Sequence, residues 1–481
     1  MNHLLNRAVM LLVVLLAAPG WSQAQGIIFV GDMEERSVDV LFPVVGGQPR
    51  LPDGPASEAL QWVLQQLVPG VSPTDQEINA RFSPAWLNST PLQQTRDFLL
   101  AIQNDYPNAV VNDLIQITPM SFTGLIRGSS GNEAFVTLGA GFSSGQINTL
   151  GVSFFGTGGG SVVFLADQGL DINQAADRFA TLSTEPGLLV ARVDGNDQCN
   201  TIVERNSSAL RATASIFKIW VQGAVADAVA DRSTTTDEIV LRADSERAPG
   251  GPVINEPANT PFTVDELSRL MLGQSDNTAT NMLHLLTGRE RNNRVVTEFG
   301  HATPEALTPF LNISEQFHLF FSFPLVTAQG YVNGTEMFQQ DFVVNSIEPL
   351  GSISDGPNIA NNTSLFTTGS WRASAMDVCS ALASQRTWAN GSDQAMLVDR
   401  ALGAGVAQPN LRNNWDRVWY KGGSLTTGGG LDVVLTHAWL LENSGEDPYV
   451  VVALSNSPNA DIDGFAIQSI TGRILELLPT L

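Results

Sequence analysis

Lysine occurs only twice in this chain of 481 residues, at Lys218 and Lys421. The chain has 25 lysines and arginines in all, and the others are arginines. Lys218 ends the sequence Ser-Ile-Phe-Lys that begins at Ser215, and Lys421 begins the sequence Lys-Gly-Gly. Arginine keeps its proton at any useful pH, whereas a desolvated lysine can be neutral near pH 7 and act as a base. The placement therefore predicts chemistry in which an amine activates a serine hydroxyl.

Residues 215–230 carry apolar side chains at helical spacing. Because residues three apart share a helix face, the amine of Lys218 is predicted to reach the hydroxyl of Ser215. The N-terminus of such a helix also supplies free N–H groups and a positive dipole end, which favour an oxyanion. Taken alone, the motif is also consistent with an ordinary amphipathic helix.

Two further motifs follow along the chain. Ser275-Asp276-Asn277 stands after a helix predicted to begin at Thr263 with a capping box, and before another that begins at 278. A polar turn between two helices would explain this triplet by itself. The Lys-Gly-Gly motif of Lys421 comes directly after a predicted strand, 418–421.

In this order the three motifs resemble the SxxK, SDN and KTG set of the penicillin-recognising serine hydrolases, in particular the class A β-lactamases. The resemblance covers about residues 170–481. It implies that Ser215 is the catalytic nucleophile and that Lys218 takes its proton. It further implies that Ser275 relays a proton to the leaving amine and that Lys421 binds a substrate carboxylate.

The same resemblance implies the substrate-binding groups. Asn277 would contact the substrate amide and Lys218, and the backbone N–H groups of Ser215 and Ser424 would form the oxyanion hole. Gly422 and Gly423 would complete the substrate-binding strand. Gly422 departs from the family, which has Thr or Ser at this position, so one hydroxyl contact to the carboxylate is missing.

A second departure concerns the base that releases the acyl group. Class A β-lactamases carry a Glu-x-x-Leu-Asn segment between the second and third motifs, and this sequence has none. Glu305 and Glu315 are the candidates in that stretch, with Glu315 retained as the candidate deacylating base and a surface role as the alternative for both. Without a placed carboxylate, an acyl-enzyme is expected to form and persist. The interval before Lys421 also indicates an insertion, placed at 320–370.

Charge and composition exclude other function classes. A net charge of −23 and a pI near 4.4 argue against nucleic acid, which requires a basic surface. The histidines show no metal-binding spacing, so neither a metal nor another cofactor is predicted. The expected partner is a small-molecule or cell-wall peptide substrate, and the oligomeric state stays open.

Residues 1–24 have the charged start, apolar stretch and small-residue cleavage site of a signal peptide. No later apolar run approaches the ~18 residues that cross a bilayer, so no membrane anchor is predicted after cleavage. These features predict a periplasmic or secreted protein. In an oxidising compartment Cys199 and Cys379 could form a disulfide, and two buried thiols are the alternative.

The predicted elements define an α+β fold with two domains. Helices at 56–68 and 91–104 precede four short strands within 109–155, and a glycine-rich break follows at 156–161. Residues 25–160 resemble the NTF2- or cystatin-like domain that precedes the hydrolase domain in the two-domain β-lactamase-like proteins typified by that of a clavulanate cluster. Residues 165–481 are predicted to form a β-lactamase/transpeptidase-like domain, with an antiparallel sheet flanked by helices.

The sequence thus predicts a secreted serine hydrolase that forms an acyl-enzyme on Ser215 with β-lactams or related amides and esters. A D-Ala-D-Ala-type carboxypeptidase or an esterase would use the same groups. A binding protein without catalysis, acting through its N-terminal domain, is the alternative from another class.

Overall fold

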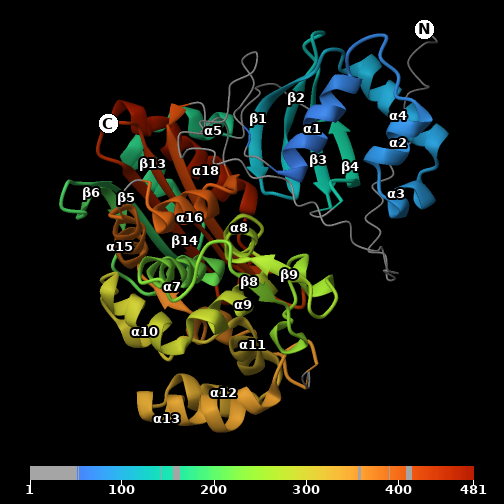
Figure 1. Ribbon diagram of the computed structural model, residues 1–481. Helices are drawn as coiled ribbons and strands as arrows, with labels where there is room; N and C mark the ends of the chain where they lie inside the picture. The colour runs from blue at the N-terminus through green and yellow to red at the C-terminus, as the bar shows by residue number, and fades with distance from the viewer. Residues whose placement is uncertain are drawn as a thin grey trace.

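The computed structural model describes residues 51, 54–141, 144–154, 163–355, 359–388, 391–407 and 414–481. The fold is mixed α/β, with two five-stranded sheets in which all neighbouring strands are antiparallel (Figure 1). The predicted signal peptide, 1–24, lies outside the described residues. No helix in the described part is both long and apolar enough to cross a membrane.

The N-terminal part places helices against a sheet of the order β11-β1-β2-β3-β4 (Figure 1). Its helices are α1 (Pro55–Gln66), α2 (Asp75–Arg81), α3 (Pro84–Ser89) and α4 (Leu92–Asp105). Its strands are β1 (Val110–Ile117), β2 (Ser121–Arg127), β3 (Glu133–Ala140), β4 (Ile147–Phe154) and β11 (Val406–Ala407). Helices followed by strands agree with the sequence prediction, to which the structure adds α2 and α3.

The edge strand β11 comes from far along the chain and pairs with the end of β1. The N-terminal sheet is therefore completed by a segment from the C-terminal part, which the sequence did not indicate. The predicted boundary at 156–161 lies outside the described residues. The two-domain division and the NTF2- or cystatin-like assignment stay predictions.

The second sheet has the order β12-β13-β14-β5-β6. Its strands are β5 (Glu185–Val193), β6 (Cys199–Arg205), β12 (Arg417–Thr426), β13 (Asp432–Glu442) and β14 (Tyr449–Asn456). Every residue of β14 is buried, because successive side chains point to opposite faces and both faces are covered. Val451 packs in the core that contains α18 (Gly464–Leu477), whereas Val452 packs in the core around α7 (Lys218–Ala230).

The sheet thus lies between helices, as the sequence predicted. On the α18 side, α6 (Ile172–Ala180) packs beside α18, and on the α7 side α15 (Ala375–Arg386) contacts β14 and β5. Helix α7 carries apolar residues around its whole circumference and forms the centre of its core. This burial determines the environment of Lys218, its first residue.

The remaining elements form a largely helical region between β6 and β12. Its longer helices are α8 (Val264–Gly273), α9 (Asn277–Thr287), α10 (Arg289–Glu298), α11 (Ile313–Phe321), α12 (Leu325–Val332), α13 (Glu336–Phe342) and α16 (Asp393–Leu402). Its short elements include α14 (Leu365–Thr368) and the 3₁₀ turn η1 (Ala214–Phe217). Two pairs of short strands also belong to it: β7 (Arg211–Ala212) with β10 (Arg372–Ala373), and β8 (Ile239–Leu241) with β9 (Pro261–Thr263). The short helix α5 (Leu165–Gln168) precedes the region.

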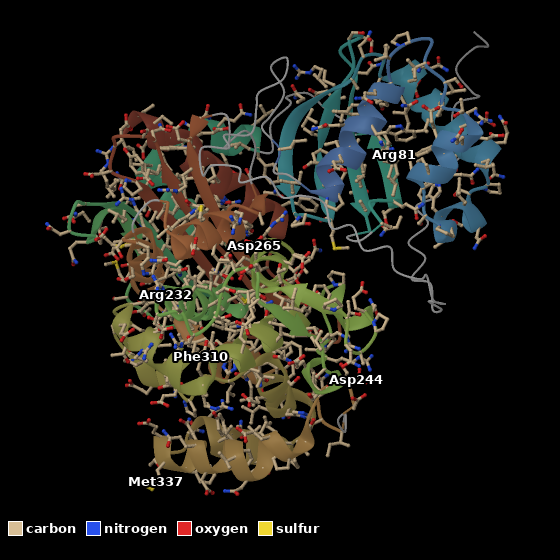
Figure 2. The ribbon with its side chains drawn as sticks, viewed as in Figure 1. Arg81, Arg232, Asp244, Asp265, Phe310 and Met337 are labelled. Atoms are coloured by element: carbon tan, nitrogen blue, oxygen red, sulfur yellow. A yellow bond between two sulfur atoms is a disulfide. The ribbon has the colours of Figure 1, made fainter. Side chains whose placement is uncertain are left out.

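The segment proposed from the sequence as an insertion, 320–370, is mainly helical despite its many polar and small residues. It contains α12, α13 and α14, and of these α12 and α13 project from the body of the protein (Figure 1). Phe320, Tyr331 and Phe366 belong to a third apolar core in this region. At its outer end Met337 is exposed (Figure 2).

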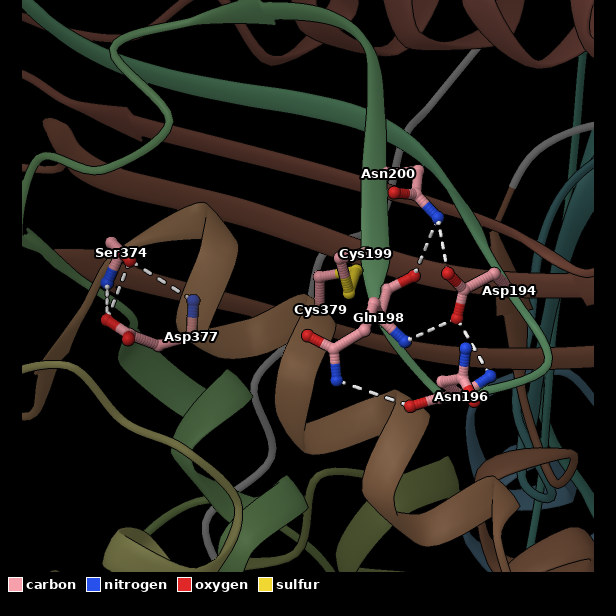
Figure 3. Close-up of a disulfide and its surroundings, with 8 residues drawn as sticks. All are labelled: Asp194, Asn196, Gln198, Cys199, Asn200, Ser374, Asp377 and Cys379. Atoms are coloured by element: carbon pink, nitrogen blue, oxygen red, sulfur yellow. Dashed lines mark hydrogen bonds between the residues drawn. A yellow bond between two sulfur atoms is a disulfide. The ribbon is translucent and has the colours of Figure 1, made fainter.

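A disulfide joins Cys199 of β6 to Cys379 of α15, so it links the edge of the second sheet to a helix that packs on it (Figure 3). The two cysteines are 180 residues apart in the sequence, and the bond closes a long loop. Cross-links that close long loops limit the freedom of the unfolded chain most strongly.

We expect reduction of this disulfide to lower the free energy of unfolding by about 2–5 kcal/mol. Denaturant unfolding with and without reductant measures the effect. The double variant C199S/C379S is the control, because reductant should not change its unfolding. Equal unfolding midpoints for the oxidised and reduced wild-type protein would contradict the expectation.

Candidate active site

The turn that carries Ser215 differs from the predicted helix. Ser215 lies in η1, immediately before α7, and its side chain is half-buried. The preceding Ala214 has a positive φ of 44°, which residues other than glycine rarely adopt. Trp371 supports the turn, since its ring stacks on Phe217 at 3.8 Å and its carbonyl oxygen accepts a hydrogen bond from the N–H of Thr213 at 3.0 Å.

Lys218 is fully buried, and its amine faces the second motif. Its Nζ donates to the carbonyl oxygen of Ser275 at 2.6 Å, to the Ser275 hydroxyl at 3.2 Å and to Oδ1 of Asn277 at 2.7 Å. The described residues show no hydrogen bond from Lys218 to the Ser215 hydroxyl. Burial lowers the pKa of Lys218 well below its ordinary value, the positive charge of Lys421 lowers it further, and Asp276 partly opposes both effects.

Ser275-Asp276-Asn277 joins α8 to α9, as predicted, and Ser275 has a positive φ of 58°. Asp276 caps α9 by accepting a hydrogen bond from the N–H of Ala279 at 2.8 Å, and its other oxygen accepts one from the N–H of Val253 at 2.9 Å. Burial raises the pKa of Asp276 to about 6. This buried carboxyl therefore fixes the conformation of the Ser275 loop by joining it to α9 and to the segment that contains Val253.

Lys421 reaches the same serine from β12. Its Nζ donates to the Ser275 hydroxyl at 3.0 Å and also to the carbonyl oxygen of Gly422. The side chain is 3% exposed, and burial lowers the pKa of Lys421 to about 7. The two lysines of the chain thus meet at one hydroxyl group.

The two glycines after Lys421 have different neighbours. A Cβ atom at Gly423 would lie 2.4 Å from the backbone nitrogen of Ser215, so only glycine lets β12 approach the nucleophile turn this closely. A Cβ atom at Gly422 would lie 2.2 Å from the hydroxyl of Tyr420, which bonds to Nδ1 of His437 at 2.9 Å. The phenol of Tyr420 therefore occupies the space that a Thr or Ser side chain would need.

Ser424, the next residue of β12, is exposed and pairs with Leu435 of β13. It lies on the same strand as Lys421, next to the glycine that contacts the Ser215 backbone. His437 lies in β13 opposite Gly422. Burial lowers the pKa of His437 to about 4, and the charge of Lys421 lowers it further.

Glu315, the predicted candidate for the deacylating base, has another role in the structure. Both of its carboxylate oxygens accept hydrogen bonds from Arg289, at 2.5 and 3.0 Å, and one also accepts the N–H of Asn312 at 2.8 Å in the capping box of α11. The group is buried and engaged in these hydrogen bonds, and its role as the deacylating base stays a prediction. Glu305, the other candidate, is exposed in a 3₁₀ turn.

One correspondence in this stretch was missed by the sequence reasoning. The segment from Thr308 to Asn312 reads Thr-Pro-Phe-Leu-Asn, which keeps the Leu-Asn pair of the Glu-x-x-Leu-Asn pattern and has Thr308 where that pattern has glutamate. The hydroxyl of Thr308 donates to the carbonyl oxygen of Pro304 at 3.1 Å. A search for the Leu-Asn pair alone would have found it.

A contact from the N-terminal sheet was also missed. The hydroxyl of Thr118, in the turn between β1 and β2, donates to Oε1 of Gln274 at 2.6 Å, one residue before Ser275. A Cβ atom at Gly273 would lie 2.9 Å from Cδ of Pro119 in the same turn. The N-terminal part therefore packs directly against the loop that holds the second motif. No pattern in the sequence predicts this contact.

Residues 172–338 match the family described as the beta-lactamase enzyme family. They include the motifs of Ser215, Lys218 and Ser275. Lys421 lies beyond the matched segment and enters the site through β12. Within the described residues, no group of three or more His, Cys, Asp or Glu side chains could hold a metal ion.

Several solved structures are similar to the chain. A β-lactamase from Sphaerobacter thermophilus has 20% sequence identity and a TM-score of 0.40, and the match covers 64% of this chain and 94% of that one. A β-lactamase from Chitinophaga pinensis has 14% identity and a TM-score of 0.41, with 63% and 96% covered. A structure described as PBP-A has 16% identity and a TM-score of 0.40, with 64% and 96% covered. No curated protein matches the chain.

Gly251 offers a test of how tightly the Ser275 loop is held. It has a φ of 106°, and a Cβ atom there would lie 2.2 Å from Oδ2 of Asp276. Gly288 also has a positive φ, 76°, but a Cβ atom there would meet no atom within 4 Å. Gly251→Ala should cost about 1–3 kcal/mol more than Gly288→Ala, because it adds a clash to the backbone strain. Denaturant unfolding measures the free energy of unfolding of the two variants. Equal losses would show that the Asp276 side chain can move to accommodate the added methyl group.

Proposed function

We propose that this protein is a serine hydrolase that forms an acyl-enzyme on Ser215 with β-lactams or related amides and esters. The observation that carries the proposal is the meeting of two buried lysines at the Ser275 hydroxyl, beside the turn of Ser215. Structural sites rarely hold two buried ammonium groups together, because desolvation and mutual repulsion both oppose it. A site that acylates a serine can use such a pair, with a neutral amine as the base and a charged amine to hold an anionic substrate group.

Lys218 is proposed as the base for acylation. The neutral amine takes the proton of the Ser215 hydroxyl as its oxygen attacks the substrate carbonyl. The proton then passes to the Ser275 hydroxyl, which bonds to Lys218, and from Ser275 to the leaving nitrogen or oxygen. Asn277 orients Lys218 through its side-chain oxygen and is proposed to contact the substrate amide.

Lys421 and strand β12 are proposed to bind the substrate. A protonated Lys421 attracts a carboxylate on the substrate, and the N–H groups of Ser215 and Ser424 are proposed as the oxyanion hole. The close approach of Gly423 to the Ser215 backbone supports this arrangement, because it brings β12 next to the nucleophile. Tyr420 covers Gly422, so its hydroxyl is the polar group nearest to the position of the missing Thr or Ser side chain.

Release of the acyl group is proposed to be slow. A general base must orient water toward the ester carbon, and Glu315 is held by Arg289 and by its own capping box. Thr308 replaces glutamate in the Leu-Asn segment and cannot serve as a carboxylate base. An acyl-enzyme that forms faster than it breaks down should accumulate.

Penicillin should therefore give a burst of one equivalent followed by slow turnover, with an adduct on Ser215. Mass spectrometry of the intact protein and of its peptides measures the adduct, and Ser215→Ala should form none. Glu315→Gln serves to test the release step and should leave the burst unchanged if the protein folds. Absence of any adduct or burst would refute the proposed function. Rapid turnover that Glu315→Gln abolishes would instead restore Glu315 as the deacylating base.

The acylation rate should depend on pH through both lysines. It should rise as Lys218 loses its proton, at a pH far below the ordinary lysine pKa of 10.5. For substrates with a carboxylate it should fall again above about pH 7, because Lys421, with a pKa of about 7, then loses the charge that holds the carboxylate. An uncharged ester should show only the rise. Acylation by the uncharged ester that falls in the same way would contradict the assignment of Lys421.

A D-Ala-D-Ala-type carboxypeptidase or an esterase would use the same groups, and parallel assays with a D-alanyl-D-alanine peptide and a simple ester distinguish these activities from β-lactam hydrolysis. A non-catalytic role through the N-terminal part is the alternative from another class. The contact of Thr118 with Gln274 favours a joint site over an independent binding module.

The proposed location is periplasmic or extracellular, supported by the predicted signal peptide and the disulfide.

A further inference from the structure

A cavity of about 250 Å³ lies behind the nucleophile turn, away from the two lysines. Its wall is formed by the 303–309 segment, by α12 and α13, and by the 368–372 segment. Ser215, Lys218, Ser275 and Lys421 do not line it. We call this space the rear cavity. Thr308, which stands where the Glu-x-x-Leu-Asn pattern has glutamate, is among its lining residues, but the proposed acylation step gives the space no role.

Two polar groups of the rear cavity have no partner. The hydroxyl of Ser370 and Nε of Arg372 are buried without a hydrogen bond to any described residue. Ser370 is 7% exposed, so its side chain is more than nine-tenths buried. Unsatisfied buried groups of this kind are uncommon and costly, and a bound molecule is a common explanation for them.

The charge of Arg372 makes the need for a partner stronger. Burial lowers the pKa of this guanidinium, and although Glu185 opposes the shift, neighbouring Arg211 adds to it. Arg372 is half-buried, and a hydrogen-bonded anion stabilises a cation whose contact with water is limited; the planar guanidinium fits a carboxylate. The apolar part of the wall includes Leu210, Val332 and Trp371. The wall also contains polar side chains such as those of Gln316 and Gln339, and the carboxylate of Glu305 borders the space.

We propose that the rear cavity binds a small organic carboxylate, with its anionic group at Arg372 and Ser370 and its apolar body against Leu210, Val332 and Trp371. The volume lies just below the range of drug-sized pockets, which suits a ligand of about ten heavy atoms. The site is separate from the carboxylate position assigned to Lys421.

The rear cavity is one residue layer from the nucleophile turn. Trp371 lines the cavity, stacks on Phe217 and accepts a hydrogen bond from Thr213. Strand β10, which contains Arg372, pairs with β7 just ahead of that turn. A bound carboxylate would therefore touch the residue that supports the Ser215 turn.

Benzoate is the probe, and benzamide is its neutral counterpart of nearly equal shape. Titration by ligand-detected NMR should give saturable binding of benzoate to the wild-type protein and none of benzamide over the same range. Arg372→Gln should weaken benzoate binding at least ~10-fold, because it removes a charge-assisted hydrogen bond. Ser370→Ala should weaken it ~3- to 10-fold, and this smaller change keeps the test valid if Arg372→Gln does not fold.

Two controls locate the binding. Arg81→Gln removes the same charge from exposed Arg81 on α2 in the N-terminal part and should leave binding unchanged (Figure 2). Lys421→Ala should leave unchanged the benzoate binding that depends on Arg372 and Ser370. Benzoate binding that Lys421→Ala abolishes, that equals benzamide binding, or that survives both Arg372→Gln and Ser370→Ala would overturn the proposal, as would the absence of saturable binding. Because the assay needs no acylation, its result is independent of the proposed function.

Discussion

The site depends on holding two buried amines at one serine hydroxyl. Two ammonium ions a few ångströms apart, both out of water, repel each other and lose their hydration. The site is stable when at least one lysine is neutral, and the lowered pKa values of Lys218 and Lys421 express this constraint. Chemistry follows from the same constraint, because the neutral amine can accept a proton while the charged one attracts an anion.

Much of the fold serves to maintain that arrangement. Lys218 is buried because α7 passes through the centre of a core, and Lys421 because β12 lies against the nucleophile turn. The Ser275 loop is fixed by Asp276 beneath it and by the Thr118 turn beside it. Strand β11 also pairs with β1. The N-terminal sheet and the C-terminal part are therefore joined by hydrogen bonds at two places, the β11–β1 pairing and the contact of Thr118 with Gln274. Separating them would alter the surroundings of Ser275.

The sequence predicted features that depend on local pattern. Alternating and periodic apolar residues located helices α1 and α4, strands β1 to β4 and strand β12, because a buried face imposes its period on the chain. The order of the three motifs, through its resemblance to the penicillin-recognising serine hydrolases, predicted that Lys218, Ser275 and Lys421 belong to one site. What the sequence did not predict depends on distant contacts. Arg289 engages Glu315, Tyr420 covers Gly422, and Thr118 bonds to Gln274, and none of these pairings leaves a periodic signal.

The scarcity of lysine permits a direct measurement of the central claim. Protein labelled with ¹³C at lysine Cε should give two signals, from Lys218 and Lys421, which Lys218→Arg and Lys421→Arg assign. The ¹³Cε shift followed against pH reports each protonation. The account predicts that Lys421 titrates at about pH 7 and Lys218 far below 10.5. Two signals that both titrate near 10.5 in the folded protein would contradict it.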